Sequence, residues 1–107
     1  MATVKLTKET FRDFALGEKP ALIEFQAPWC VYCRRIASAF DKVAEQYSGV
    51  LNVGMVDIDD DEALADEYGV ELVPTLIFYK NGQPAGSITA PDSKARIDEF
   101  IKEHLEN

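Results

Sequence analysis

Residues 21–27 form an almost continuous apolar run, and a helical pattern begins a few positions later, at Cys30. A strand that is apolar on both faces has to be covered on both faces, so it is expected at the centre of a sheet flanked by helices. After Cys30, apolar side chains recur at the spacing of one helix face, at Ile36, Phe40, Val43, Ala44 and Tyr47. The sequence therefore predicts a buried strand that leads into a long amphipathic helix.

The rest of the chain adds strands and helices around this centre. Apolar runs predict further strands at residues 3–6, 50–58, 75–79 and 85–89. Helical spacing predicts one helix after Thr7, a short one at 60–68 and a last one after 91–93. Alternating strands and helices imply parallel pairing with right-handed crossovers, whereas the Asn81-Gly82 turn implies an antiparallel hairpin. We therefore expect an α/β fold with a mixed sheet and helices on both faces.

Composition limits the possible partners. The chain has 107 residues, 47% of them hydrophobic and 28% charged, which is typical of a single domain over residues 1–107 with a real core. The formal net charge of −8 argues against non-specific binding to nucleic acid or anionic membranes, because both need basic surface. Neither a signal-peptide pattern nor an apolar run of membrane-spanning length is present, so we expect a soluble, cytoplasmic protein.

Cys30 and Cys33 are the only cysteines. A disulfide between them would close a loop so small that its chain-entropy stabilisation is only about 2 kcal/mol, which is little for a structural staple. A closed zinc site needs four ligands, and His104 is the only other soft candidate, so no metal is expected. The acidic run at 57–62 lacks the glycine and the last ligand of a calcium loop, and it fits a helix N-terminus better.

A helix N-terminus suits a reactive cysteine pair. If Cys30 opens the helix, unpaired N–H groups and the helix dipole favour its thiolate, and Cys33 lies nearly one turn further on. Such a position can lower a thiol pKa from about 8.5 to roughly 3.5–7.5. We expect an accessible Cys30 that attacks and a deeper Cys33 that resolves; the alternative is a pair of inert buried cysteines.

Three segments resemble the thioredoxin family, and the similarity extends over essentially the whole chain. They are residues 25–34, Phe-Gln-Ala-Pro-Trp-Cys-Val-Tyr-Cys-Arg, residues 73–76, Val-Pro-Thr-Leu, and residues 79–82, Tyr-Lys-Asn-Gly. The resemblance implies a thioredoxin fold, a central mixed sheet of about five strands flanked by about four helices, and it supplies the strand order. It also implies a Cys30–Cys33 redox-active disulfide and disulfide exchange with protein substrates.

The resemblance further implies the partners. In thioredoxins the protein works as a reductant, and electrons come from a thioredoxin reductase that uses NADPH, so the chain itself needs no bound cofactor. Its partners would be disulfide-containing proteins and this reductase, and we expect a monomer that binds neither nucleic acid nor membrane.

The residues between the cysteines depart from the family. Val31-Tyr32 replaces the usual Gly-Pro, so the Tyr32 N–H is available to a sulfur, which should favour the thiolate and a more oxidising pair. The positive charges of Arg34 and Arg35 would also favour the thiolate. The alternative is that these two side chains only form a solvated helix face. Because Tyr32 is also typical of glutaredoxins, a glutathione-dependent oxidoreductase is an alternative.

Glu24 is a carboxylate in the apolar strand, on the same strand face as Gln26. It matches the buried Asp that thioredoxins place beneath the resolving sulfur. There, desolvation would raise its pKa and make it a proton acceptor for Cys33. The family's lysine partner is replaced by Met55. The alternative is an exposed strand face on which Glu24 pairs with a Lys or Arg.

By resemblance, a substrate-docking surface surrounds the cysteines. Trp29 corresponds to the family's active-site tryptophan, while Gln26 stands where a second one is common. The docking surface would also include Val31 and Tyr32 between the cysteines, the loop Val73-Pro74-Thr75 and Ala90. Pro74 is expected to be cis, and Ala90 replaces a family glycine. A third possibility is a non-catalytic binding module that uses the Trp29 and Pro74 surface without redox turnover.

Overall fold

The computed structural model describes residues 3–106, which form a five-stranded sheet with four helices. The elements in chain order are β1 (Val4–Leu6), α1 (Lys8–Ala15), β2 (Ala21–Gln26), α2 (Val31–Gln46), β3 (Asn52–Asp57), α3 (Glu62–Glu67), β4 (Thr75–Lys80), β5 (Gln83–Thr89) and α4 (Lys94–Glu106). The expected mixed sheet flanked by helices is confirmed.

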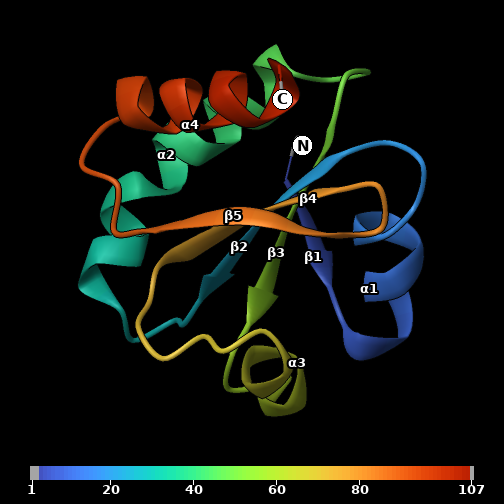
Figure 1. Ribbon diagram of the computed structural model, residues 1–107. Coiled ribbons are helices and arrows are strands. Elements are labelled where there is room, and N and C mark those ends of the chain that lie inside the picture. The colour runs from blue at the N-terminus through green and yellow to red at the C-terminus, as the bar shows by residue number, and fades with distance from the viewer. Residues whose placement is uncertain (1–2, 107) are drawn as a thin grey trace.

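The sheet has the strand order β1-β3-β2-β4-β5 (Figure 1). The two β3 pairings, with β1 and β2, are parallel, whereas β2 with β4 and β4 with β5 are antiparallel. The last pairing follows from the two-residue turn at Asn81-Gly82, where both residues have positive φ, 57° and 78°. The apolar strand β2 is therefore the centre of the sheet, as its composition predicts.

Alternate residues of β2 face two separate cores. Its odd-numbered residues and Phe11 belong to the cluster under α1 and α3. Leu22 belongs to the cluster under α2 and α4, together with Phe40, Phe78 and Phe100. The two helix pairs cover opposite faces of the sheet (Figure 1). Because Glu24 is two residues after Leu22, it lies on the α2 side.

Several element ends differ from the sequence prediction. β3 begins at Asn52 rather than residue 50 because the Val50 and Leu51 N–H groups donate to the Tyr47 carbonyl and complete the turn after α2. Similarly, α3 begins at Glu62 because the two preceding N–H groups donate to the Asp57 carbonyl. The Ser93 hydroxyl caps α4 as expected, accepting a bond of 3.1 Å from the Arg96 N–H.

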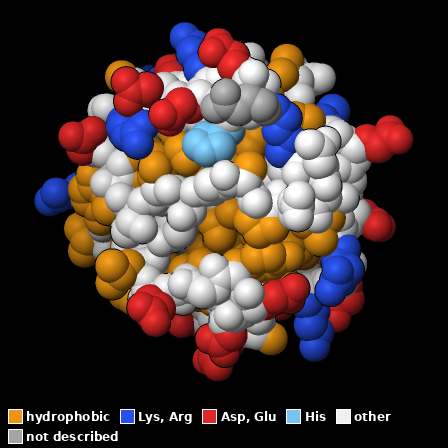
Figure 2. Space-filling model, viewed as in Figure 1, with side chains coloured by type: hydrophobic (Ala, Val, Ile, Leu, Met, Phe, Trp, Pro, Cys, Tyr) orange, Lys and Arg blue, Asp and Glu red, His pale blue; other side chains and the backbone are white. Residues whose placement is uncertain are grey.

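The β5 strand is one edge of the sheet and is largely exposed. Figure 2 shows hydrophobic side chains on both sides of this edge and charged side chains mainly around the rim. Within residues 3–106, no helix is both long and apolar enough to cross a membrane.

Candidate active site

The two cysteines lie at the N-terminus of α2 and form a disulfide, with Cα atoms 5.2 Å apart. Cys30 is the N-cap residue, and its Sγ accepts a hydrogen bond of 3.1 Å from the Cys33 N–H. A sulfur in this position receives both a backbone donor and the positive end of the helix dipole. The expectation that Cys30 opens the helix is confirmed.

The expectation of an openly accessible Cys30 is wrong for the disulfide form. Cys30 is 6% exposed and Cys33 is 4% exposed. Both pack in a small cluster with Ala27, against Ile58 and Val73. The physical reason is that the loop at residue 73 covers the disulfide, with the Val73 carbonyl oxygen 3.8 Å from Cys30 Sγ. The two cysteines therefore hardly differ in solvent exposure. They differ in hydrogen bonding, because only Cys30 Sγ accepts a bond from the backbone of the other cysteine.

The backbone donor to the sulfur differs from the prediction. The sequence points to the Tyr32 N–H, but the Cys33 N–H is the group that donates to Cys30 Sγ. Tyr32 contributes through its side chain, which is half-buried and donates from its hydroxyl to the Pro91 carbonyl at 3.0 Å. Val31 is exposed beside it. The Arg34 guanidinium folds back onto the Pro28 carbonyl, 2.6 Å away, at the turn before Cys30.

Glu24 is buried, at 4% exposure, so the alternative of an exposed, paired carboxylate is wrong. Within residues 3–106 its Oε2 has no hydrogen-bond partner. Burial raises the pKa of Glu24 to about 7, and the like charge of Asp41 adds to the increase. Met55 is the β3 residue opposite Glu24, as the sequence suggests, and it offers no charge. The carboxyl group is therefore poised to gain or lose a proton near neutral pH.

Trp29 lies in the turn before Cys30 and is 63% exposed. Its indole N–H donates to Asp59 Oδ2 at 2.9 Å, and the Asp59 N–H in turn donates to Asp57 Oδ1. The bond to Asp59 fixes the ring orientation at the surface, next to the cysteines in the chain. Leu72 is exposed to a similar extent, 67%, and adds a second large apolar side chain near the same end of the sheet.

The Val73-Pro74 peptide bond is cis, as the resemblance implies. The Val73 carbonyl oxygen lies 3.8 Å from Cys30 Sγ, so this loop faces the disulfide. Thr75 is buried, and its hydroxyl donates to the Leu72 carbonyl at 2.6 Å, which holds the loop. Ala90 donates its N–H to the Pro74 carbonyl at 2.8 Å. The structure thus brings together the cysteines, residues 73–74 and Ala90.

Sequence reasoning missed three residues around the site, Asp41, Asp59 and Leu72, and it missed the bond that Pro91, next to Ala90, accepts from Tyr32. Asp59 and Pro91 bond to aromatic side chains from distant segments, and nothing in their local pattern indicates this. Asp41 affects Glu24 from the facing helix and accepts a bond from the Thr3 hydroxyl at 2.6 Å. Only Leu72 carries a usable signal, since it precedes the Val73-Pro74 motif.

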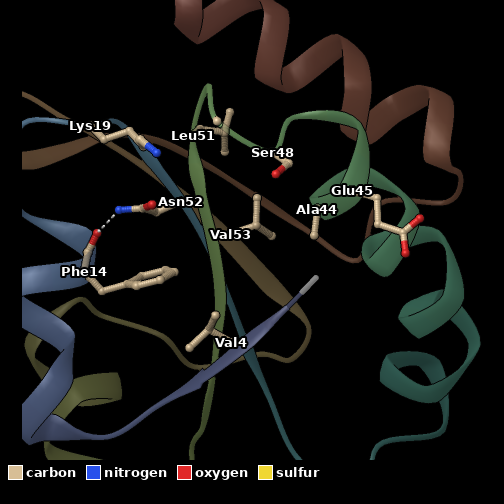
Figure 3. Close-up of a pocket in the computed structure, with 10 residues that line it drawn as sticks. Val4, Phe14, Lys19, Ala44, Glu45, Ser48, Leu51, Asn52 and Val53 are labelled. Atoms are coloured by element: carbon tan, nitrogen blue, oxygen red, sulfur yellow. Dashed lines mark hydrogen bonds between the residues drawn. The ribbon is translucent and has the colours of Figure 1, made fainter. Parts of the chain in front are cut away.

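One cavity lies at the other end of α2 from the cysteines. It measures about 420 Å³, and its lining includes residues of β1, β3 and the C-terminal end of α2 (Figure 3). Asn52 at its edge donates to the Phe14 carbonyl at 3.0 Å. None of the candidate site residues lines it. Among residues 3–106 no cluster of three or more side chains is suited to hold a metal ion.

Comparison with known proteins agrees with the geometry. A sequence model of the thioredoxin family matches residues 2–103. The chain is 33% identical to "Thioredoxin 1" of Nostoc sp. over 105 residues, 97% of this chain and 98% of the relative. It is 34% identical to "Thioredoxin 1" of Synechococcus elongatus over 101 residues, 94% of each. It is also 34% identical to "Thioredoxin M-type, chloroplastic" of Pisum sativum over 89 residues, 83% of this chain and 52% of the relative.

The chain belongs to the thioredoxin family. With its cysteine pair at a helix N-terminus, it is a thiol–disulfide oxidoreductase, and thioredoxins act on disulfide-containing proteins. Neither the glutaredoxin-like reading nor the non-catalytic binding module is favoured. The departures from the thioredoxin pattern are Val31-Tyr32 between the cysteines, Glu24 with Met55 opposite it in β3, and Ala90. These positions distinguish this member of the family.

Proposed function

We propose that this thioredoxin-family protein reduces disulfides in other proteins, with Cys30 as nucleophile and Cys33 as resolving residue. The Cys30 thiolate attacks one substrate sulfur, a mixed disulfide forms, and the other substrate sulfur leaves as a thiolate. Cys33 then gives up its proton and attacks Cys30 Sγ, which releases the second substrate thiolate. The substrate gains two electrons and the protein is left with the Cys30–Cys33 disulfide.

The observation that carries these roles is the hydrogen bond from the Cys33 N–H to Cys30 Sγ. An N-cap sulfur with a backbone donor is stabilised as an anion, whereas Cys33 lies within the first turn and is itself the donor residue. A stabilised thiolate keeps Cys30 ionised near neutral pH, which favours its attack on a substrate disulfide. This difference between the two cysteines supports Cys30 as the residue that attacks the substrate and Cys33 as the residue that resolves the mixed disulfide.

We propose Glu24 as the proton acceptor for Cys33. It lies on the sheet face that α2 covers, and its pKa of about 7 lets it take up a proton near neutral pH. In Glu24→Gln, resolution of the mixed disulfide should slow by about tenfold or more at neutral pH, and the rate should lose its dependence on a group titrating near pH 7. A variant with an unchanged pH profile would refute this role.

The test of the cysteine roles is a trapping experiment. Cys33→Ser should accumulate a mixed disulfide with a disulfide-bearing protein such as insulin, visible on a non-reducing gel and by mass spectrometry. Cys30→Ser is the matched control, because it keeps one thiol in the same turn, and it should trap nothing. Equal trapping by both variants would refute the assignment.

We also propose that an NADPH-dependent thioredoxin reductase supplies the electrons and that the protein acts as a cytoplasmic monomer. The exposed Trp29 beside the cysteine pair and the Val73-Pro74 loop supports a protein partner, and the net charge of −8 opposes self-association. Turnover with reductase and NADPH, and little with glutathione alone, is the expected result. Rapid turnover with glutathione alone would reverse the proposal, and sedimentation of the free protein checks the oligomeric state.

A further inference from the structure

Tyr32 connects the cysteine turn to a distant loop. It lies between Cys30 and Cys33 in the first turn of α2, and its hydroxyl donates to the Pro91 carbonyl, 59 residues away in the chain. Its half-buried ring packs against both the cysteine cluster and the larger core beneath α2 and α4. The ring is thus held on two sides, and the hydroxyl is aimed at one backbone oxygen.

The loop that Tyr32 reaches is strained. Ala90 has φ +48°, in the left-handed region that side chains other than glycine rarely adopt. Such a conformation persists only where surrounding contacts impose it. Two contacts do so here: the Ala90 N–H donates to the Pro74 carbonyl at 2.8 Å, and the neighbouring Pro91 carbonyl accepts from Tyr32.

The same loop borders the face where a substrate would meet the disulfide. The Ala90 N–H donates to the Pro74 carbonyl, and the Val73 carbonyl lies 3.8 Å from Cys30 Sγ. A cavity of about 340 Å³ opens beside this loop, with Ala90 and Pro91 in its wall and Arg96 and Asp92 also lining it. The cavity wall is thus joined, through the bond from Ala90 to Pro74, to the loop that faces the disulfide. The position of residues 90–91 therefore affects an extended substrate more than a small one.

We propose that the Tyr32 hydroxyl is a positioning group that holds residues 90–91 in the conformation that docks extended protein segments next to the substrate disulfide. This proposal rests on the proposed function. It makes Tyr32 a determinant of preference for protein disulfides over small disulfides. The Gly-Pro pair usual in the family has no side chain that reaches the Pro91 carbonyl, so the link belongs to this chain's own Val31-Tyr32 sequence.

The test compares Tyr32→Phe, which keeps the ring and removes only the hydroxyl, with the wild-type protein. Tyr47→Phe is the matched control, since Tyr47 follows the end of α2 and its buried hydroxyl has no hydrogen-bond partner within residues 3–106. Rates of insulin reduction are measured over a range of insulin concentrations with dithiothreitol as regenerating reductant. The rate of the reduced protein with hydroxyethyl disulfide is measured alongside.

Loss of one neutral hydrogen bond corresponds to about a two- to tenfold effect. In Tyr32→Phe, KM for insulin should rise by about this factor, with a smaller change in kcat, and the ratio of insulin rate to small-disulfide rate should fall. Tyr47→Phe should keep the wild-type ratio. A Tyr32→Phe protein with the wild-type KM and ratio would overturn the proposal.

A second measurement separates this proposal from the proposed function. Amide hydrogen exchange at Ala90, relative to amides in β4, should be about two- to tenfold faster in Tyr32→Phe, while exchange at Ala90 is no faster in Tyr47→Phe than in wild type. If wild-type protein fails to reduce insulin, the proposed function fails, and exchange at Ala90 still tests the loop. Unchanged exchange at Ala90 in Tyr32→Phe would refute the positioning role whatever the activity.

Discussion

Replacing Glu24 with glutamine should change how stability depends on pH. The pKa of this buried carboxyl rises from its ordinary value of 4.5 to about 7, mainly through desolvation and secondarily through Asp41. Because the folded-state value is raised, the fold favours the neutral form. The associated stability is fully present below about pH 4.5 and is lost as the pH rises through 7. At about 1.4 kcal/mol per pKa unit, the loss is about 3 kcal/mol.

Glutamine has nearly the same shape and never ionises. The free energy of unfolding of Glu24→Gln should therefore match wild type within about 1 kcal/mol near pH 4 and exceed it by about 3 kcal/mol near pH 8. Urea unfolding of the oxidised proteins at several pH values measures this difference. Glu45→Gln is the control, because it deletes an exposed carboxyl from α2. A gap between Glu24→Gln and wild type that stays constant with pH would refute the reasoning.

Three further substitutions test contacts around the site and the core. Trp29→Phe loses the bond to Asp59 and should destabilise the protein by about 1 kcal/mol in urea unfolding; no loss would mean that the bond contributes nothing. Tyr47→Phe removes a buried hydroxyl without a partner within residues 3–106, so it should be neutral or stabilising by about 1 kcal/mol, and clear destabilisation would contradict this. Gly86→Ala places a Cβ against the His104 imidazole, which is held by its bond to the Phe100 carbonyl. The substitution should lower the free energy of unfolding by about 1–3 kcal/mol in the wild-type protein but by little in the His104→Ala variant. An equal loss in both backgrounds would exclude the clash.

Periodicity predicted the elements, and local chemistry predicted the centre of the site. The apolar faces of β2 could belong only to a central strand, and a cysteine pair at the start of an amphipathic helix indicated the reactive turn. The strand order needed the family resemblance, because alternating polarity says which face is buried but not which strand is the neighbour. Element ends shifted where turns such as the one after Tyr47 used backbone groups that periodicity assigned to strands.

The contacts that refine the site were beyond sequence reasoning. The bonds of Trp29 to Asp59 and of Tyr32 to Pro91 join segments 30 and 59 residues apart, and each depends on where the chain returns in space. The sequence left open whether Glu24 lies on a buried or an exposed strand face. In the structure both faces of β2 are buried, and Glu24 is 4% exposed. Cys30 was expected in the open, but the residue 73 loop that covers it comes from the other half of the chain.

Selective alkylation tests the central claim most directly, namely that the fold distinguishes two sulfurs three residues apart. The reduced protein is treated with a limiting amount of iodoacetamide near neutral pH, and the modified cysteine is identified by peptide mass spectrometry. Since Cys30 and Cys33 differ little in exposure, 6% against 4%, preference should follow the backbone donor at the helix N-terminus. Nearly exclusive modification of Cys30 is the predicted result, and equal modification of both or preference for Cys33 would contradict the account.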